Sequence, residues 1–182
     1  MTPEELVERE RKFLVADHRI IDGLPKTRFL QGYIAVTRAV ELRIRTGPAG
    51  QALTVKAAAA PSVESGRPEI RLEENFPLQQ RELAYPLIEA CNGRVLVKTR
   101  YVKHEAIDDD HTDVWTIDEY HGDNRGLLLA EFEYPLEVST VAALHVPSWV
   151  GREVTGEARF YGQNLSVYPV REWSQDERQD LV

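Results

Sequence analysis

The stretch Glu8-Arg9-Glu10-Arg11-Lys12-Phe13-Leu14-Val15 sets the pattern that predicts the fold. In a β-strand successive side chains point to opposite faces, so Glu8, Glu10 and Lys12 share one face. The other face carries two arginines and then Phe13 and Val15. We therefore predict a β-strand over residues 8–15 with one fully charged face.

Six more segments show the same alternation between turn residues, over 41–45, 52–57, 69–76, 95–102, 114–120 and 127–134. The turns Thr46-Gly47-Pro48-Ala49-Gly50 and Gly122-Asp123-Asn124-Arg125-Gly126 suit antiparallel hairpins. Helices are expected over 78–91, where Pro86 marks a kink or the true start, and over 137–144 and 172–181. The pattern predicts a mainly β (α+β) fold: an antiparallel barrel or sandwich with helices covering part of its outside.

Composition limits the class of protein. The chain has 182 residues with 22 basic and 30 acidic side chains, a net charge of −8, and no linker, which favours one domain over residues 1–182. A hydrophobic share of 42% and the lack of a long apolar run argue against a membrane protein. The single cysteine, Cys91, excludes an internal disulfide framework, and the N-terminus lacks a secretory pattern, so we expect a cytoplasmic location. The acidic excess argues against non-specific nucleic-acid binding.

The charged faces are segregated by sign, which an ordinary solvated sheet does not require. Acidic side chains dominate the face on the first and last predicted strands, and basic ones on the second, third and fifth. If the sheet closes into a barrel, these faces can line its interior. Carboxylates bind Mg²⁺ or Mn²⁺, while arginine and lysine neutralise phosphate oxygens. The faces therefore predict a metal–polyphosphate ligand; the alternative is that they are simply solvated.

Short motifs recur in order along the chain, beginning with the E-x-E-x-K pattern of residues 8–12. The others are Gln31-Gly32-Tyr33, Glu41-Leu42-Arg43-Ile44-Arg45, Leu53-Thr54-Val55-Lys56, Lys98-Thr99-Arg100-Tyr101, Trp115-Thr116-Ile117-Asp118, Ala130-Glu131-Phe132-Glu133 and Trp149-Val150-Gly151-Arg152-Glu153-Val154-Thr155. This series resembles the CYTH or triphosphate tunnel metalloenzyme family, which includes inorganic triphosphatases, thiamine triphosphatases and class IV adenylate cyclases. The resemblance runs from about residue 8 to 165 and leaves 166–182 as a polar tail, expected to be helical in part.

The resemblance implies a closed eight-stranded antiparallel tunnel in which a small-molecule triphosphate is hydrolysed with Mg²⁺ or Mn²⁺. The residues implied to bind phosphate are Lys12, Arg43, Arg45, Lys56, Lys98 and Arg100. The residues implied to hold metal are Glu8, Glu10, Asp118, Glu131 and Glu133, with Glu73 as a further candidate. Tyr33 beside Lys12 resembles a catalytic pair that tunes the lysine for proton transfer. No membrane or nucleic-acid partner is expected, and a homodimer stays open.

One strand departs from the family pattern. Where relatives usually carry E-F-E-Y-E, this chain has Arg71-Leu72-Glu73-Glu74-Asn75, so Glu73 alone remains of three carboxylates on one face. Relatives also usually have Asn-Ser where this chain has Gly162-Gln163. Both departures concern the second metal position and the substrate preference rather than the fold.

Two other functions compete with hydrolysis. An adenylate cyclase of the same family would bind triphosphate in the same way and use the ribose 3′-hydroxyl as nucleophile, so cyclic AMP would replace phosphate as the product. A non-catalytic polyphosphate-binding module would bind triphosphate without turnover, and the thinned carboxylate strand around Arg71 and Asn75 keeps this alternative open.

Overall fold

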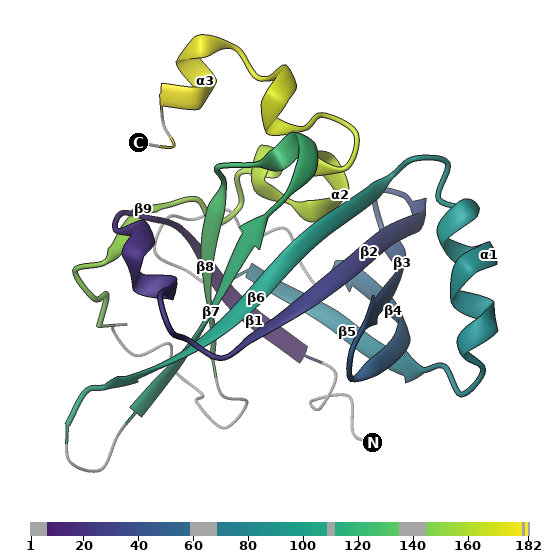
Figure 1. The fold of residues 1–182 in the computed structure, drawn as a ribbon, viewed down its shortest axis with the longest axis horizontal. Helices are drawn as coiled ribbons and strands as arrows, with labels where there is room; N and C mark the ends of the chain where they lie inside the picture. The colour runs from purple at the N-terminus through teal and green to yellow at the C-terminus, as the bar shows by residue number, and fades with distance from the viewer. Residues whose placement is uncertain (1–6, 59–68, 109–111, 135–144, 180, 182) are drawn as a thin grey trace.

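The computed structural model describes residues 7–58, 69–108, 112–134, 145–179 and 181, and most of them lie in β-strands (Figure 1). The strands are β1 (Val7–Val15), β2 (Lys26–Val36), β3 (Val40–Gly47), β4 (Gly50–Ala58), β5 (Glu69–Pro77), β6 (Val95–Ala106), β7 (Thr112–Tyr120), β8 (Leu128–Glu133) and β9 (Val150–Glu153). The helices are α1 (Ala84–Glu89), α2 (Gly162–Leu165) and α3 (Gln175–Gln179), with short 3₁₀ turns between several elements.

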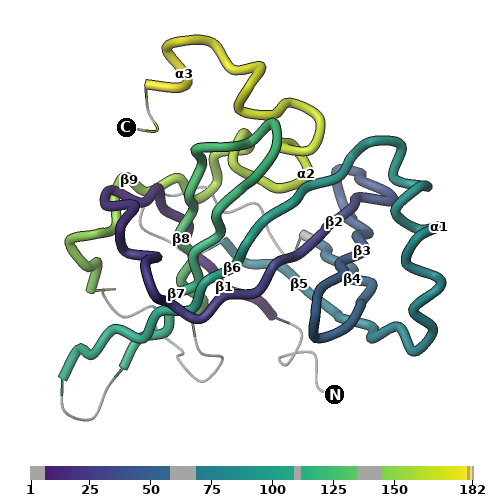
Figure 2. Tube along the Cα trace, in the orientation of Figure 1, coloured from purple at the N-terminus to yellow at the C-terminus, as the bar shows by residue number. Residues whose placement is uncertain are grey.

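The strands form a closed antiparallel barrel. Their order is β5-β4-β3-β2-β6-β7-β8-β1, with β9 beyond β1, and β5 also pairs with β1. Eight of the nine strands therefore close on themselves, while β9 extends the free part of the β1 edge. The predicted eight-stranded antiparallel barrel is confirmed. Strands β6 and β7 continue past the barrel as a long hairpin (Figure 2), because residues 112–114 of β7 pair with β6 alone.

All seven predicted strands are present, but the alternation did not reveal β2 or β9. Strand β2 escaped prediction because Gly32 interrupts its apolar pattern. A Cβ at Gly32 would lie 2.5 Å from the Cys91 sulfur, so only glycine lets the segment after α1 pack this closely on the outside of β2. Strand β9 has four residues, too few to show a period.

The helices are shorter than predicted. The helix expected over 78–91 is α1, which begins at Ala84, and Pro86 lies in its first turn, where a missing N–H is tolerated. The helix expected over 172–181 is α3, which begins after Ser174 because Ser174 and Glu177 exchange hydrogen bonds of 2.8 and 3.2 Å in a capping box. The helix expected over 137–144 lies outside the described residues. None of the helices in the described ranges is long and apolar enough to cross a membrane.

An aromatic cluster packs on the outer face of β1, β7 and β8. Trp115 is fully buried at its centre, with ring centroids 5.6 Å from Phe13, 5.2 Å from Phe132 and 5.4 Å from Trp149. Strand β9 is held over this cluster by Arg11, whose Nε and Nη2 donate to the Glu153 carboxylate at 2.9 and 2.6 Å. Apolar packing outside the barrel leaves the inward faces free to be polar.

A second apolar cluster closes one end of the barrel. Leu14, Leu96 and Leu129 continue the inward faces of their strands and are buried with Phe160 and Leu165. These last two residues belong to the segment around α2, which lies across that end of the barrel (Figure 1). The interior is therefore apolar at the α2 end and charged along the remainder.

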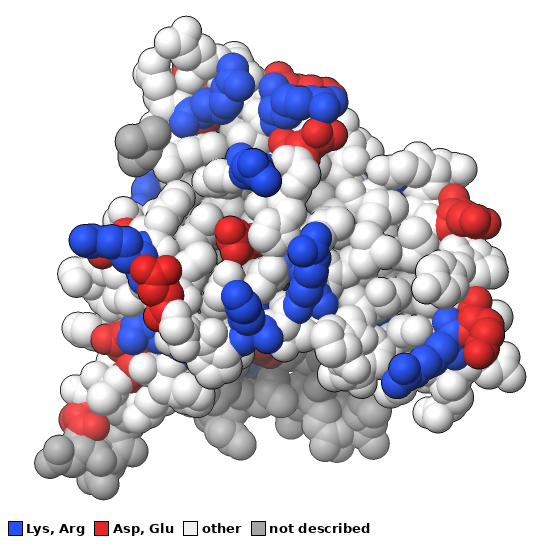
Figure 3. Space-filling view, viewed as in Figure 1, with Lys and Arg blue, Asp and Glu red and all other residues white. Residues whose placement is uncertain are grey.

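The outer surface mixes charges of both signs. On the face shown in Figure 3, basic and acidic side chains form small separate groups divided by uncharged surface. The segregation of charge by sign that the sequence displays is therefore a property of the inward faces, not of this outer face.

Replacing Trp115 tests the aromatic cluster. Trp115→Ala should lower the free energy of unfolding by about 3–5 kcal/mol, because it leaves a cavity among three other rings. Urea unfolding followed by fluorescence or circular dichroism measures the change. The neighbouring Val114 is 45% exposed, so Val114→Ala should change stability by only about 0.5 kcal/mol. Equal losses in the two variants would contradict this assignment of the core.

Candidate active site

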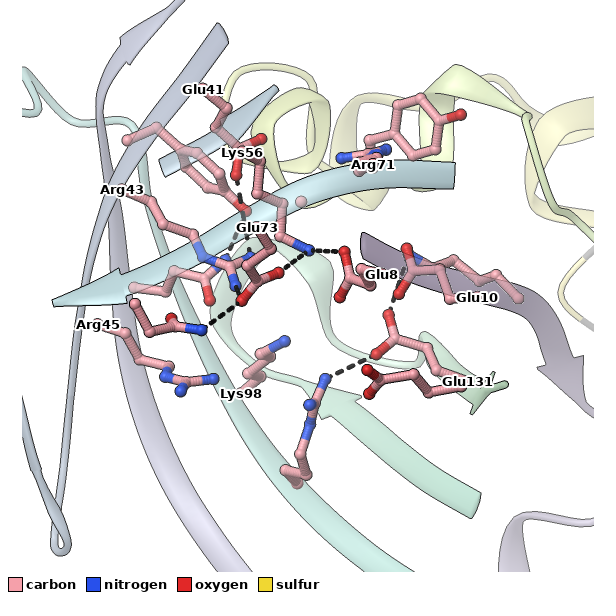
Figure 4. A pocket seen from close by; sticks show the side chains of 18 of the residues that line it. Glu8, Glu10, Glu41, Arg43, Arg45, Lys56, Arg71, Glu73, Lys98 and Glu131 are labelled. Carbon is pink, nitrogen blue, oxygen red and sulfur yellow. Dashed lines mark hydrogen bonds and ion pairs between the residues drawn. The ribbon is translucent and has the colours of Figure 1, made fainter. Parts of the chain in front are cut away.

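The inward faces of the barrel enclose a cavity of about 380 Å³ (Figure 4). The predicted site residues that line it are Glu8, Glu10, Lys12, Tyr33, Arg43, Arg45, Lys56, Glu73, Lys98, Arg100, Glu131 and Glu133. Asp118 is the one predicted site residue that does not line it. The alternative of simply solvated faces does not apply to these strands, because their charged faces meet inside the closed barrel.

Four carboxylates lie together on two adjacent strands, and we call Glu8, Glu10, Glu131 and Glu133 the carboxylate sector. Strands β1 and β8 pair so that Glu10 lies opposite Glu133 and Lys12 opposite Glu131. Because alternate residues share a face, this register places all four on the inner side of the barrel. The sheet pairing thus produces a cluster that the sequence shows only as two separate stripes.

Two members of the carboxylate sector, Glu8 and Glu133, have raised pKa values. Burial raises the pKa of Glu8 to about 7, with Lys56 opposing the shift and the negative charges of Glu10 and Glu73 adding to it. Burial and the same two carboxylates also raise the pKa of Glu133. These two groups bind protons more readily than usual because nearby positive charge does not fully compensate them.

The donor chemistry of the sector fits a hard divalent cation. Its ligand atoms are all carboxylate oxygens, which Mg²⁺ and Mn²⁺ prefer. In the described part of the chain, no three acidic, histidine or cysteine side chains are yet gathered closely enough to hold a metal together. The sector therefore supplies suitable ligands in one region, where Glu8 pairs with Lys56 and both Glu10 and Glu131 pair with Lys12.

Five cations line the opposite side of the cavity, and we call them the basic sector: Arg43, Arg45, Lys56, Lys98 and Arg100. Lys56 Nζ lies 2.6 Å from Glu8 Oε2 and 2.5 Å from Glu73 Oε2, so it connects the two sectors. Arg43 Nη2 lies 3.3 Å from the other Glu73 oxygen. Burial would raise the pKa of Glu73, but Lys56 and Arg43 outweigh it and lower that pKa to about 2. The structure thus places Glu73 among the cations, with Lys56 held between it and Glu8 of the carboxylate sector.

Arg45 differs from the other members of the basic sector. No carboxylate of the described residues lies within 4.0 Å of it, and its guanidinium carbon lies 5.1 Å from the centre of the Phe29 ring. Burial and the positive charges of Arg43 and Arg100 lower the pKa of Arg45. Its unpaired charge makes Arg45 the member of the sector best placed to receive an anion.

Asp118 lies beneath the cavity lining and is fully buried. Its Oδ2 accepts hydrogen bonds of 2.6 Å from both Lys98 Nζ and Arg100 Nη2, and its Oδ1 accepts one of 2.8 Å from Arg100 Nε. Arg100 Nη2 also donates to Glu131 Oε2 at 2.7 Å. Both oxygens of Asp118 are thus engaged by two basic side chains, which it orients toward the cavity.

Lys12 lies at the boundary between the two sectors. Its Nζ lies 3.0 Å from Glu131 and 3.6 Å from Glu10. Burial would lower the pKa of Lys12, but these two carboxylates outweigh it and hold that pKa well above the usual value. Lys12 is therefore a firmly protonated cation in this arrangement. Tyr33 lines the same cavity, but its hydroxyl accepts a 2.6 Å hydrogen bond from Gln31 rather than contacting Lys12.

Comparison with known proteins gives relatives across nearly the whole chain, although no family model matches. The sequence is 30% identical over 170 residues to an inorganic triphosphatase from Acetivibrio thermocellus, covering 92% of this chain and 98% of that protein. The fold is similar to the crystal structure of the inorganic triphosphatase NE1496, with a TM-score of 0.57, 30% identity, and coverage of 88% and 94% of the two chains.

The chain belongs to the triphosphate tunnel metalloenzyme, or CYTH, family. The resemblance read from the ordered motifs is thereby confirmed. In this tunnel enzyme the motifs supply residues of the cavity from β1, β2, β3, β4, β6 and β8, and the closed barrel is what brings them together.

Several lining residues of this tunnel enzyme were not among the predicted site residues. They are Val7, Gln31, Glu41, Arg71, Asn75, Tyr120, Tyr161 and Gly162. Alternation within 69–76 already placed Arg71 and Asn75 on the face of Glu73, so that signal was available. Tyr161 and Gly162 come from the non-strand segment that closes the barrel end, where no periodicity could have identified them.

The charge state of Lys98 should control anion affinity at alkaline pH. Burial and the charge of Arg100 lower the pKa of Lys98 to about 8, against the opposing effect of Asp118. Below that pH the ammonium is charged, and as pH rises through it the charge is lost. Titration calorimetry with tripolyphosphate in EDTA should show affinity falling by up to about tenfold per pH unit above 8. Lys98→Arg should remove this loss of affinity, because arginine stays charged. An equal dependence of affinity on pH in the two proteins would contradict the prediction.

Proposed function

We propose that this protein hydrolyses inorganic tripolyphosphate to diphosphate and phosphate inside the barrel, with Mg²⁺ or Mn²⁺ held by the carboxylate sector. The observation that carries the proposal is the joining of an oxygen-ligand sector to a basic sector within one cavity of the barrel. The similarity to an inorganic triphosphatase over 92% of the chain supports the choice of reaction. The cytoplasmic location and the homodimer remain predictions from the sequence.

The carboxylate sector is the proposed cation site. Glu8, Glu10, Glu131 and Glu133 would supply its oxygen ligands, and Asp118 and Glu73 would instead hold the phosphate-binding cations in place. When bound, the cation neutralises phosphate oxygens and favours deprotonation of water near the terminal phosphorus. The pKa of Glu8, raised to about 7 by burial, is consistent with a carboxylate that gains stability when a cation arrives.

The basic sector is the proposed phosphate site. Arg43, Arg45 and Arg100 can each donate two hydrogen bonds to phosphate oxygens, while the lysines act as point charges. A water oxygen forms a bond to the terminal phosphorus and gives up a proton to the solvent, the bond to the bridging oxygen breaks, and diphosphate leaves with the electron pair. Charge on the departing oxygens is stabilised by fixed cations that need no reorganisation. Lys12, protonated between the sectors, is placed to contribute to this stabilisation.

The lining favours an inorganic substrate over a nucleotide. Charged and polar side chains make up almost all of it, and the apolar contribution is limited to Val7 and the rings of three tyrosines. A nucleoside base would need an apolar or stacking surface free of charged neighbours. The ring of Tyr161 is instead occupied by Arg71, whose guanidinium carbon lies 4.8 Å from the ring centre.

A substrate panel tests the reaction. Purified protein should release phosphate from tripolyphosphate faster than from ATP or thiamine triphosphate, and only with Mg²⁺ or Mn²⁺ present. Phosphate and cyclic AMP are both measured in each assay. Cyclic AMP from ATP would instead indicate a cyclase, and tight binding of tripolyphosphate without turnover would indicate a binding module. Either result would overturn the proposal.

Replacing a single carboxylate tests the cation site. Glu10→Gln keeps the side-chain shape but removes the charge, so metal-dependent phosphate release should fall by about 100-fold or more. The melting temperature should stay close to wild type. Glu74→Gln is the matched control, because Glu74 alternates to the outer face of β5 beside the inward Glu73. Full activity in Glu10→Gln would mean that the cation binds elsewhere.

Arg45 tests the phosphate site. Arg45→Ala removes a charged donor that is free of carboxylate partners, so kcat/KM for tripolyphosphate should fall by about 100- to 1,000-fold with little loss of stability. Steady-state kinetics and thermal melting measure the two effects. Arg28→Ala, a change on the exposed face of β2, should leave both near wild type. Parallel losses in the two variants would argue for a general effect of surface charge instead.

A further inference from the structure

Tyr33 is almost completely buried in the wall of the cavity. It is 1% exposed, and its backbone N–H donates to the Arg94 carbonyl at 2.9 Å. The register between β2 and β3 shifts between Tyr33 and Ala35, so the strand is irregular directly after this residue. Such irregularities re-aim a side chain relative to a regular strand. Strand β2 therefore directs Tyr33 to one defined place at the apolar end of the cavity.

Two residues confine the Tyr33 hydroxyl itself. Gln31, on the same inward face of β2, donates from Nε2 to the Tyr33 oxygen at 2.6 Å. Gly162, the first residue of α2, lies so close that a Cβ there would collide with that oxygen. The ring carbon bearing the hydroxyl would lie 3.2 Å from the same Cβ, a much milder contact. A Cβ at position 162 would also lie 3.3 Å from Leu96 Cδ1, so the hydroxyl oxygen is the atom it would meet by far most closely.

The Gln31 contact leaves the hydrogen of the Tyr33 hydroxyl unused. A phenol oxygen accepts hydrogen bonds through its lone pairs and donates one hydrogen. Since Gln31 occupies a lone pair, the O–H hydrogen remains available for another acceptor, and in the described residues Gln31 is the only group hydrogen-bonded to this oxygen. The Gln31 amide oxygen likewise has no partner there. A bound polyanion would bring phosphate oxygens into the same cavity as further acceptors for this O–H.

We infer that Gln31 and Gly162 are positioning residues, which hold Tyr33 so that its O–H donates to a phosphate oxygen of the substrate. The inference rests on the proposed hydrolysis for the identity of that acceptor, but the confinement of Tyr33 is independent of it. Tyr33 would be the catalytic residue that touches substrate, and the other two residues act only through it. Burial, with the charge of Glu41 adding to it, raises the pKa of Tyr33, which keeps the proton on the oxygen.

A double-mutant cycle tests this inference. Gly162→Ala is made in the wild-type chain and in Tyr33→Phe, which lacks the oxygen that the new methyl group would meet. In the wild type, kcat for tripolyphosphate should fall by about 10- to 100-fold, with KM changed less than about threefold. In Tyr33→Phe, adding Gly162→Ala should change kcat by less than about twofold. Equal losses in the two backgrounds would overturn the inference.

Two additions keep the test decisive. Gln31→Met removes the amide donor while preserving chain length, and it should lower kcat in the wild type but not in Tyr33→Phe. Gln163→Ala, next to Gly162 on α2, is the matched control and should retain wild-type kcat. Thermal melting without substrate repeats the cycle: Gly162→Ala should lower the melting temperature in the wild type and much less in Tyr33→Phe. If the protein does not hydrolyse tripolyphosphate but Gly162→Ala lowers the melting temperature only when the Tyr33 hydroxyl is present, the substrate role is refuted and the confinement of Tyr33 stands. If Gly162→Ala lowers the melting temperature equally in the wild type and in Tyr33→Phe, the confinement is refuted.

Discussion

Burial of ionised side chains inside a closed sheet is the constraint on which this structure depends. Moving a charge from water into a barrel costs several kcal/mol unless an opposite charge accompanies it. Asp118 shows the solution most clearly, because it is fully buried and takes hydrogen bonds from both Lys98 and Arg100. The barrel can therefore hold a charged interior only if the register of its strands brings opposite charges together. Antiparallel pairing of β6 with β7, which sets Arg100 opposite Asp118, meets that requirement.

Some buried charges of the interior lack a full set of opposite charges, and this distinguishes a binding site from a set of structural ion pairs. Where pairing is complete, as at Glu73 with Lys56 and Arg43, the carboxylate is firmly ionised and its pKa falls to about 2. Where it is incomplete, the imbalance remains: the pKa of Glu133 is raised, and Arg45 has no carboxylate partner in the described structure. A cation at the first position and an anion at the second would each complete the compensation. A polyanion that carries its own metal satisfies both at once.

The sequence could predict those parts of the arrangement that follow from the alternation of side chains along a strand. Period two along residues 8–12 and 41–45 identified the inward charges, and the order of motifs identified the barrel that encloses them. Alternation could not show that Asp118 lies under the lining, because a shared face does not reveal depth. Strand β2 was hidden by Gly32, whose role depends on the packing of Cys91 from another segment. The sequence marked Gly162 only as a departure from the family pattern, since its close approach to Tyr33 across the barrel end depends on a contact between distant segments.

The unusual strand β5 follows the same rule of compensation. Arg71 places a cation on the inward face of β5, and Glu69 accepts its hydrogen bonds at 2.9 and 2.7 Å. Asn75 accepts a hydrogen bond from Thr54 at 2.7 Å and donates one to Glu73 at 2.9 Å. Each replacement thus has its own partner, so neither requires a metal for stability. The carboxylates whose pKa values are raised, Glu8 on β1 and Glu133 on β8, lie instead on the two strands that form the carboxylate sector.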